Sequence, residues 1–291
     1  MPKVSIVKVE KDDVKAAVYK SLDLLRIMPS DKIKKVLIKP NLCHYFTPDT
    51  GITTDPRVVG SIIDYIRDKV NKNVEFIIGE ADATEMKADI AFKVLGYERL
   101  AEEKKVRLLN LSKDKRLKVA GKFVKEISLS INECDLFITV PKLKTHMDVK
   151  ISICLKNQFG AIPYPRKIIF HKNLEEAIIE ASKFMKPDLC VVDGMVALEG
   201  KGPISEGLPR KMNLIIGGDD PVATDYVCTR IMGLSRVKYV MMAEKQNLGS
   251  TKNIQILGEK IENVKTKFMV VNPKEYILSF AQNIFNLVVK K

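Results

Sequence analysis

The stretch Val36-Leu37-Ile38-Lys39-Pro40-Asn41 decides the fold of this 291-residue chain. Three apolar residues in a row predict a short strand that is buried on both faces, as the strands of a parallel sheet are. Polar residues follow at the point where that strand ends. The same arrangement occurs four more times, at Phe76–Ile78 before Gly79-Glu80-Ala81-Asp82, at Phe137–Val140 before Pro141–His146, at Val191-Val192 before Asp193-Gly194, and at Ile215-Ile216 before Gly217-Gly218-Asp219-Asp220.

Stretches with helical periodicity separate these strands. Asp55-Pro56 and Asp220-Pro221 each predict a helix start, because aspartate can cap the first turn and proline suits the first helical position. Strands that alternate with helices predict an α/β fold with a mainly parallel sheet, helices on both faces and a Rossmann-like arrangement. We treat residues 1–291 as one domain, with a candidate lobe boundary near residues 159–172. Further helices are predicted at 13–25, 86–95, 174–185, 236–247 and, at the end of the chain, 273–289.

Composition narrows the class of protein. Hydrophobic residues make up 46% and charged residues 29% of the chain, which is typical of a soluble globular protein. No apolar run approaches the roughly 18 residues of a membrane span, and the first residues alternate like a strand instead of forming a secretion signal. We therefore expect a cytoplasmic protein with no membrane partner.

The five cysteines, at positions 43, 134, 154, 190 and 228, are about twenty or more residues apart. This spacing excludes the closely spaced pairs that hold zinc or an iron–sulfur cluster. It also argues against a disulfide scaffold. We expect isolated buried thiols and no intrinsic iron–sulfur cluster.

The net charge of +13, from 49 Lys and Arg against 36 Asp and Glu, raises the possibility of a nucleic-acid partner. Such a partner needs a basic patch, not only a basic average. The densest basic run lies between Lys104 and Lys125, where Phe123 is the one aromatic residue. An RNA- or DNA-binding surface and an ordinary exposed face of a lysine-rich protein both remain open for this run.

The richest polar segment is Pro141-Lys142-Leu143-Lys144-Thr145-His146, which follows a predicted strand. Ligands of open α/β sheets bind beyond the carboxyl ends of the strands. Lysines there can hold a phosphate or carboxylate, and a histidine can act as acid or base near neutral pH. Lys156 and Asn157 follow a short apolar stretch that could return them to the same edge. We expect His44 to be a solvated loop residue and His171 to be structural.

Acidic and glycine-rich segments complete the set of candidate residues. Glu80, Asp193, Glu199 and Asp219 could hold a divalent metal or move a proton. Among the three aspartates of the segment at 219–225, Asp219 is the one with no evident structural duty, whereas Asp220 is explained as a helix cap. Glycines near 200–202 could let backbone amides approach a ligand. Neither the Walker A spacing nor a G-x-G-x-x-G motif is present, so ATP or NAD binding is not indicated.

Several segments together resemble the DUF362 family of bacteria and archaea. The most specific are Lys142-Leu143-Lys144-Thr145-His146 and Glu199-Gly200-x-Gly202-Pro203. The others are Lys39-Pro40-Asn41, Thr53-Thr54-Asp55-Pro56, Gly79-Glu80, Lys156-Asn157-x-Phe159-Gly160, Asp193-Gly194 and Asp220-Pro221-Val222-Ala223-x-Asp225. The resemblance gives weight to the strand-end residues. Some family members are fused to ferredoxin-type modules, which implies redox chemistry, but this chain lacks the clustered cysteines and would need a separate iron–sulfur partner.

The leading hypothesis is an enzyme that acts on an anionic small molecule in a cleft at the strand ends. Two alternatives stay open: a basic RNA- or DNA-binding protein, and a redox accessory protein. The reaction, the substrate, the cofactor and the oligomeric state are not indicated. The predicted catalytic residues are His146, Lys144 and Glu80; the predicted ligand-binding residues are Lys39, Asn41, Lys142, Thr145, Lys156, Asn157, Gly200 and Gly202; the candidate metal ligands are Asp193, Glu199 and Asp219.

Overall fold

A computed structural model describes residues 1–27, 30–204 and 207–271. In this part of the chain, ten strands form one large sheet with the order β12-β1-β11-β10-β7-β2-β3-β4, and β8 and β9 extend it from β10. The strands are β1 (Lys3–Lys8), β2 (Lys35–Pro40), β3 (Glu75–Glu80), β4 (Arg107–Asn110), β7 (Leu136–Val140), β8 (Lys142–His146), β9 (Lys150–Ile151), β10 (Leu189–Gly200), β11 (Gly207–Gly218) and β12 (Gln255–Gly258).

The sheet has a parallel part and an antiparallel part. Strands β10, β7, β2, β3 and β4 run parallel, and the register aligns Ile38 of β2 with Ile78 of β3 and with Ile138 of β7. The carboxyl ends of β2, β3 and β7 therefore reach the same edge. Strand β11 is antiparallel to both of its neighbours, β10 and β1. The mainly parallel sheet predicted from the sequence is confirmed, whereas the long β10–β11 hairpin was not predicted.

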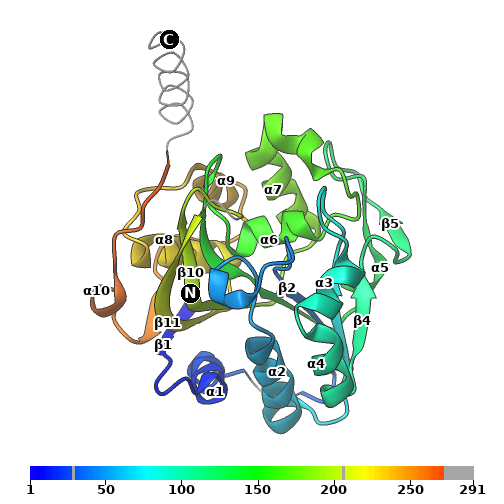
Figure 1. Cartoon of the computed structure of the whole chain (residues 1–291), viewed down its shortest axis with the longest axis horizontal. Helices are drawn as coiled ribbons and strands as arrows, with labels where there is room; N and C mark the ends of the chain where they lie inside the picture. Colours follow the sequence, from blue (N-terminus) through cyan, green and yellow to red (C-terminus); the bar gives the residue numbers. More distant parts are fainter. Residues whose placement is uncertain (28–29, 205–206, 272–291) are drawn as a thin grey trace, which may run out of the picture.

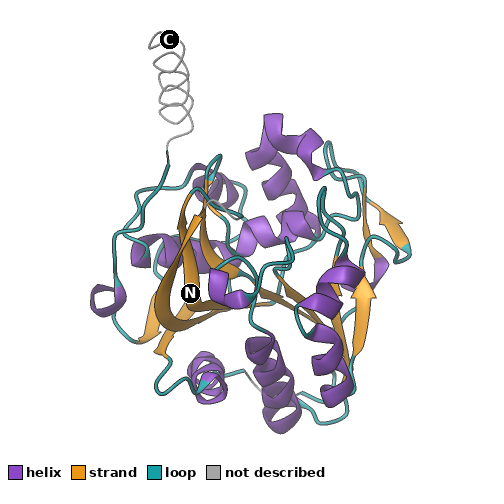
Figure 2. Cartoon of the chain, viewed as in Figure 1, coloured by secondary structure: helices purple, strands orange, loops and turns teal. Residues whose placement is uncertain are grey.

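Helices cover both faces of the sheet (Figures 1 and 2). One face carries α1 (Val14–Leu25), α2 (Pro56–Tyr65), α3 (Ala88–Val94) and α4 (Tyr97–Lys104). The other carries α6 (Cys154–Gly160), α7 (Leu174–Phe184), α8 (Pro221–Ile231) and α9 (Lys238–Lys245). Along β2, Val36 and Ile38 pack into the first core and Leu37 into the second. Because both faces are buried, the strand is apolar throughout instead of alternating.

Two aspartates begin their helices as the sequence predicts. The carboxylate of Asp55 accepts the backbone N–H of Arg57 at 2.8 Å, and Pro56 is the first residue of α2. Asp220 accepts the N–H groups of Val222 and Ala223 at 2.8 and 2.9 Å ahead of α8. Each cap satisfies amide groups that have no partner inside the helix, which is worth about 1 kcal/mol.

Smaller elements connect the layers: β5 (Arg116–Lys118) with β6 (Glu126–Ser128), α5 (Leu129–Asn132), α10 (Ile261–Val264), η1 (Pro48–Thr50), η2 (Ile66–Val70) and η3 (Lys167–Asn173). The helix predicted at 273–289 lies outside the described residues. Among the helices that are described, none has the length and apolar character that a membrane crossing requires.

Candidate functional site

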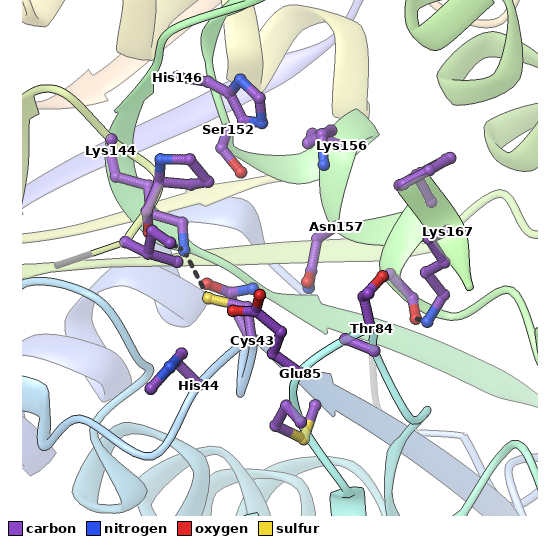
Figure 3. A pocket seen from close by; sticks show the side chains of 18 of the residues that line it. Cys43, His44, Thr84, Glu85, Lys144, His146, Ser152, Lys156, Asn157 and Lys167 are labelled. Atoms are coloured by element: carbon purple, nitrogen blue, oxygen red, sulfur yellow. Dashed lines mark hydrogen bonds between the residues drawn. The ribbon is translucent and has the colours of Figure 1, made fainter. Parts of the chain in front are cut away.

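A cavity of about 480 Å³ lies at the carboxyl ends of the parallel strands (Figure 3). Strands β2, β3 and β8 contribute its floor, and α6 and η3 contribute side chains from the covering layer. The structure brings eight of the sequence-predicted residues to this cavity: Lys39, Asn41, Glu80, Lys144, His146, Lys156, Asn157 and Gly202.

Lys39 and Glu80 form a fully buried ion pair on the floor of the cavity. Lys39 Nζ lies 2.7 Å from Glu80 Oε1 and donates to Asn157 Oδ1 at 3.0 Å. The other oxygen of Glu80 accepts the N–H of Leu42 at 2.9 Å. Burial lowers the pKa of Lys39, and the charge of Glu80 opposes that shift. Since both oxygens of Glu80 have partners, this carboxylate fixes the ends of β2 and β3 and is poorly placed to move a proton.

Lys144 is buried beside the cavity with neutral partners. Its Nζ donates to the carbonyl of Ile52 at 3.0 Å, to the carbonyl of Pro203 at 3.4 Å and to the sulfur of Cys43 at 3.2 Å. An ammonium group has three hydrogens, so these three acceptors satisfy it. None of them carries a carboxylate charge, and the positive charge of Lys144 is therefore available to a ligand.

Lys156 reaches the cavity from the first turns of α6. Its Nζ lies over the ring of Phe159, 4.6 Å from the ring centre, and within the described residues it has no hydrogen bond or ion pair. Burial, and next the nearby charge of Lys144, lower the pKa of Lys156 to about 8. The helix is held in place by buried Asp225 of α8, which accepts the N–H of Cys154 at 2.7 Å.

His146 is 4% exposed and lines the same cavity. Its Nδ1 accepts the backbone N–H of Asp148 at 3.2 Å, so the neutral ring carries its hydrogen on Nε2. Burial, followed by the charges of Lys156 and Lys144, holds the pKa of His146 well below its usual range. At neutral pH this side chain is therefore an uncharged hydrogen-bond donor, which is a narrower role than general acid or base.

Several residues that line the cavity were not predicted from the sequence. Lys167 of η3 donates to the carbonyls of Asp82 and Gly160, both at 2.7 Å, and burial lowers its pKa to about 7. Cys43 lies three residues after the end of β2, so it could have been predicted as a strand-end residue. Lys167 carries no such signal, because it comes from the covering layer and not from a strand end. The other unpredicted lining residues include His44, Thr84, Glu85 and Ser152, which Figure 3 labels, and also Asp148 and His171.

Three predicted ligand-binding residues lie outside the cavity lining. Lys142 Nζ is 2.9 Å from Asp193 Oδ2, and both side chains are 0% exposed. The same oxygen of Asp193 accepts the N–H of Asp55 at 2.8 Å, which ties α2 to the sheet. Thr145 Oγ1 donates to the carbonyl of Gly200 at 3.1 Å and holds β8 against β10. These contacts give the three residues structural duties.

The three candidate metal ligands do not come together. Glu199 accepts from Arg210 at 2.7 Å and from the N–H of Met269 at 3.0 Å, while Asp193 is neutralised by Lys142. Asp219 accepts the N–H of Lys3 at 2.7 Å at the opposite edge of the sheet, because β11 is antiparallel and ends where the parallel strands begin. Within residues 1–27, 30–204 and 207–271, no three His, Cys, Asp or Glu side chains are grouped to hold a metal.

Cysteine placement also differs from expectation. Cys154, Cys190 and Cys228 are fully buried, as expected, but they are neighbours and not isolated. Burial, and then the thiol of Cys190, raise the pKa of Cys154 well above its usual range. Segments that are distant in sequence meet in the core here, which spacing along the chain cannot show.

Much of the basic run at 104–125 is neutralised within the fold. Lys104 pairs with Asp64 at 2.9 Å, Lys113 with Asp89 at 2.8 Å, and Arg116 with Glu126 at 3.0 Å. Strand β4 also divides the run, so Lys104 and Lys113 lie at opposite ends of that strand. These three side chains therefore have partners within the fold.

The fold and the cavity together define an α/β protein with a lysine-lined pocket at the carboxyl ends of its parallel strands. Residues 36–230 match the family described as domain of unknown function DUF362, and the chain belongs to that family.

The proteins that are similar to the chain include one from a cyanobacterium and one solved structure. The thylakoid-associated protein sll1697 of Synechocystis is 28% identical over 231 residues, covering 77% of this chain and 70% of that protein. The lactate racemase apoprotein of Thermoanaerobacterium thermosaccharolyticum is a solved structure with 17% identity and a TM-score of 0.47; the match covers 80% of this chain and 58% of that one.

Proposed function

We propose that the cavity binds a small anionic molecule and that this protein is an enzyme acting on it. One observation carries the proposal: Lys144 and Lys156 both line the cavity, and neither has a carboxylate partner among the described residues. Burial, and next the positive charge of Lys144, lower the pKa of Lys156, so the two like charges repel each other. An anion between them relieves that repulsion.

The balance of charge around the cavity supports this reading. Five lysines line it against three carboxylates, those of Glu80, Glu85 and Asp148. Glu80 is engaged by Lys39, and the side chain of Asp148 is 48% exposed, so water screens it. A buried carboxylate on a ligand, by contrast, would interact with Lys144 and Lys156 at short range and low dielectric.

His146 supplies the chemical role that fits this site best. A neutral imidazole that donates from Nε2 can hydrogen-bond to an oxygen of the bound molecule and polarise the bond to that oxygen. Asn41 adds a buried Oδ1 that has no donor in the described structure and that can accept an N–H or O–H from the ligand. We assign Lys144 and Lys156 to charge recognition and His146 to polarisation.

Calorimetric titration with oxalate and with inorganic phosphate tests the binding. We expect Lys144→Met to weaken the affinity by about 10- to 100-fold, because the anion loses its attraction to a buried positive charge that no carboxylate neutralises. Lys118→Met is the matched control, since Lys118 is exposed on β5 and does not line the cavity. Failure of both anions to bind, or equal affinity in the two variants, contradicts the proposal.

A further inference from the structure

We infer that Lys156 forms an imine with the carbonyl carbon of the bound anion, so that the substrate class is a small carbonyl compound that carries a negative charge, such as a 2-oxo acid. The inference rests on the proposed function, because the anion site is what brings the carbonyl to the lysine. It assigns a covalent role to a residue that the anion site alone would use only for its charge.

The first argument is the difference in bonding among the cavity lysines. Lys39 is held by Glu80, Lys144 by three acceptors, and Lys167 by two backbone carbonyls at 2.7 Å. Lys156 has only the face of Phe159 beneath its amine and no hydrogen-bond acceptor in the described part of the chain. Its nitrogen is thus the one among these four that can turn its lone pair toward a bound molecule.

The second argument is the surroundings of that amine. A lysine becomes nucleophilic when it is desolvated or lies next to another cation, and Lys156 meets both conditions, through its burial and through the nearby charge of Lys144. Its pKa of about 8 leaves roughly 300-fold more neutral amine at pH 7 than an ordinary lysine has. The other titratable groups that interact electrostatically with the Lys156 amine are Cys43 after β2, Asp148 after β8, Lys39 of β2, and the ring of His146.

The step balances without any further reactant. The neutral amine of Lys156 adds to the carbonyl carbon, which forms a C–N bond and breaks the π bond to oxygen. His146 Nε2–H hydrogen-bonds to that oxygen as negative charge develops on it. The oxygen then leaves as water with two protons from the nitrogen, and a C=N bond results. Nothing is oxidised or reduced, and hydrolysis reverses the step.

Reductive trapping tests the inference on the full-length protein. Pyruvate forms the imine with the lysine, and cyanoborohydride reduces this imine to a stable secondary amine. Peptide mass spectrometry then locates the modified lysine. We expect the label at Lys156, and a loss of at least about tenfold in Lys156→Arg, because a guanidinium stays protonated and does not form imines. Lys118→Arg is the matched control and should label as the wild type does. In a parallel reaction acetone replaces pyruvate, because acetone has the carbonyl group but no negative charge.

The outcomes separate the two proposals. Labelling of Lys156 by pyruvate in clear preference to acetone supports both. Oxalate binding in calorimetry together with no label at Lys156, or with the label at Lys167 instead, overturns the imine while the anion site stands. Equal labelling by acetone and pyruvate, with no oxalate binding, overturns the anion site while the reactive lysine stands. No label and no binding overturns both.

Discussion

Lys142 and Lys144 lie two residues apart on β8, are equally buried, and yet have opposite surroundings. Lys142 is neutralised by Asp193 at 2.9 Å, whereas Lys144 meets two carbonyls and a thiol. The first lysine holds the fold together, and the second presents a charge to a cavity. Under the proposed function, a single motif, Lys-Leu-Lys-Thr-His, serves stability at one end and ligand recognition at the other.

The pairing of β8 with β10 explains the difference. Lys142 is opposite Asp193 in the parallel register, but the register then shifts, and Lys144 is opposite Leu198. A directly opposed carboxylate is thus available to the first lysine and an apolar side chain to the second. Because of this register shift, β10 places no carboxylate directly opposite Lys144.

The largest expected effect comes from breaking the buried pair. Lys142→Met leaves the carboxylate of Asp193 buried without its cation, which we expect to lower the free energy of unfolding by about 3–5 kcal/mol. Urea denaturation measures it. The double variant Lys142→Met/Asp193→Asn should recover part of the loss, because the amide oxygen still accepts the N–H of Asp55, although the amide nitrogen cannot accept the N–H of Met195 in place of the other carboxylate oxygen. If Lys142→Met alone is as stable as the wild type, the pair does not play the structural role assigned to it.

The sequence predicted the parallel part of this fold well, for a physical reason. A strand buried on both faces must be apolar throughout, and Val36–Ile38 shows that pattern in the sequence itself. The apolar run at Leu214–Ile216 reads the same way, although β11 is antiparallel. Direction is set by pairing and not by composition, and so Asp219 was assigned to the wrong edge.

The site was predictable as far as it consists of strand ends. Lys39, Glu80, Lys144 and His146 were found in that way, since parallel strands end at one edge. The bonding of each side chain was not predictable, because Asp193 and Lys142 meet across 51 positions and Cys43 and Lys144 across 101. In the covering layer, Lys156 and Asn157 were predicted from the apolar stretch before them, whereas Lys167 of η3 follows neither a strand end nor such a stretch.

Removal of the Lys144 charge, which has no carboxylate partner, should affect the free energy of unfolding much less than removal of the Lys142 charge, which is paired with Asp193. Lys144→Met takes a donor from the carbonyls of Ile52 and Pro203 but leaves no charge unpaired, so we expect a loss of about 1–2 kcal/mol in the free energy of unfolding. The same urea denaturation series measures it. A loss as large as that of Lys142→Met would show that both lysines serve the fold and would remove the contrast between them.

Measuring oxalate affinity as a function of pH tests the role of Lys156, the second cavity lysine without a carboxylate partner. Since the pKa of Lys156 is about 8, oxalate affinity should be highest below that pH and fall by roughly tenfold as pH rises through it, when the amine loses its charge. His146 stays neutral across this range, because its pKa lies well below its usual value. Lys167, with a pKa of about 7, adds a separate and earlier decline.

Lys156→Arg identifies the source of that pH effect, because arginine remains charged throughout the series. In calorimetry the decline near pH 8 should disappear, and the decline near pH 7 should remain. A profile identical to that of the wild type would assign the effect to another group.

The smallest expected effect belongs to Asp219, which the sequence placed among the candidate ligands. Its carboxylate accepts the backbone N–H of Lys3 at 2.7 Å at the edge opposite the cavity, and an asparagine oxygen can accept the same bond. We therefore expect Asp219→Asn to change oxalate affinity by less than about twofold and the free energy of unfolding by less than about 0.5 kcal/mol. Calorimetry and urea denaturation check the two values. A large loss of affinity would mean that charge at the far edge reaches the ligand, and the division of the sheet into a binding edge and a structural edge would no longer hold.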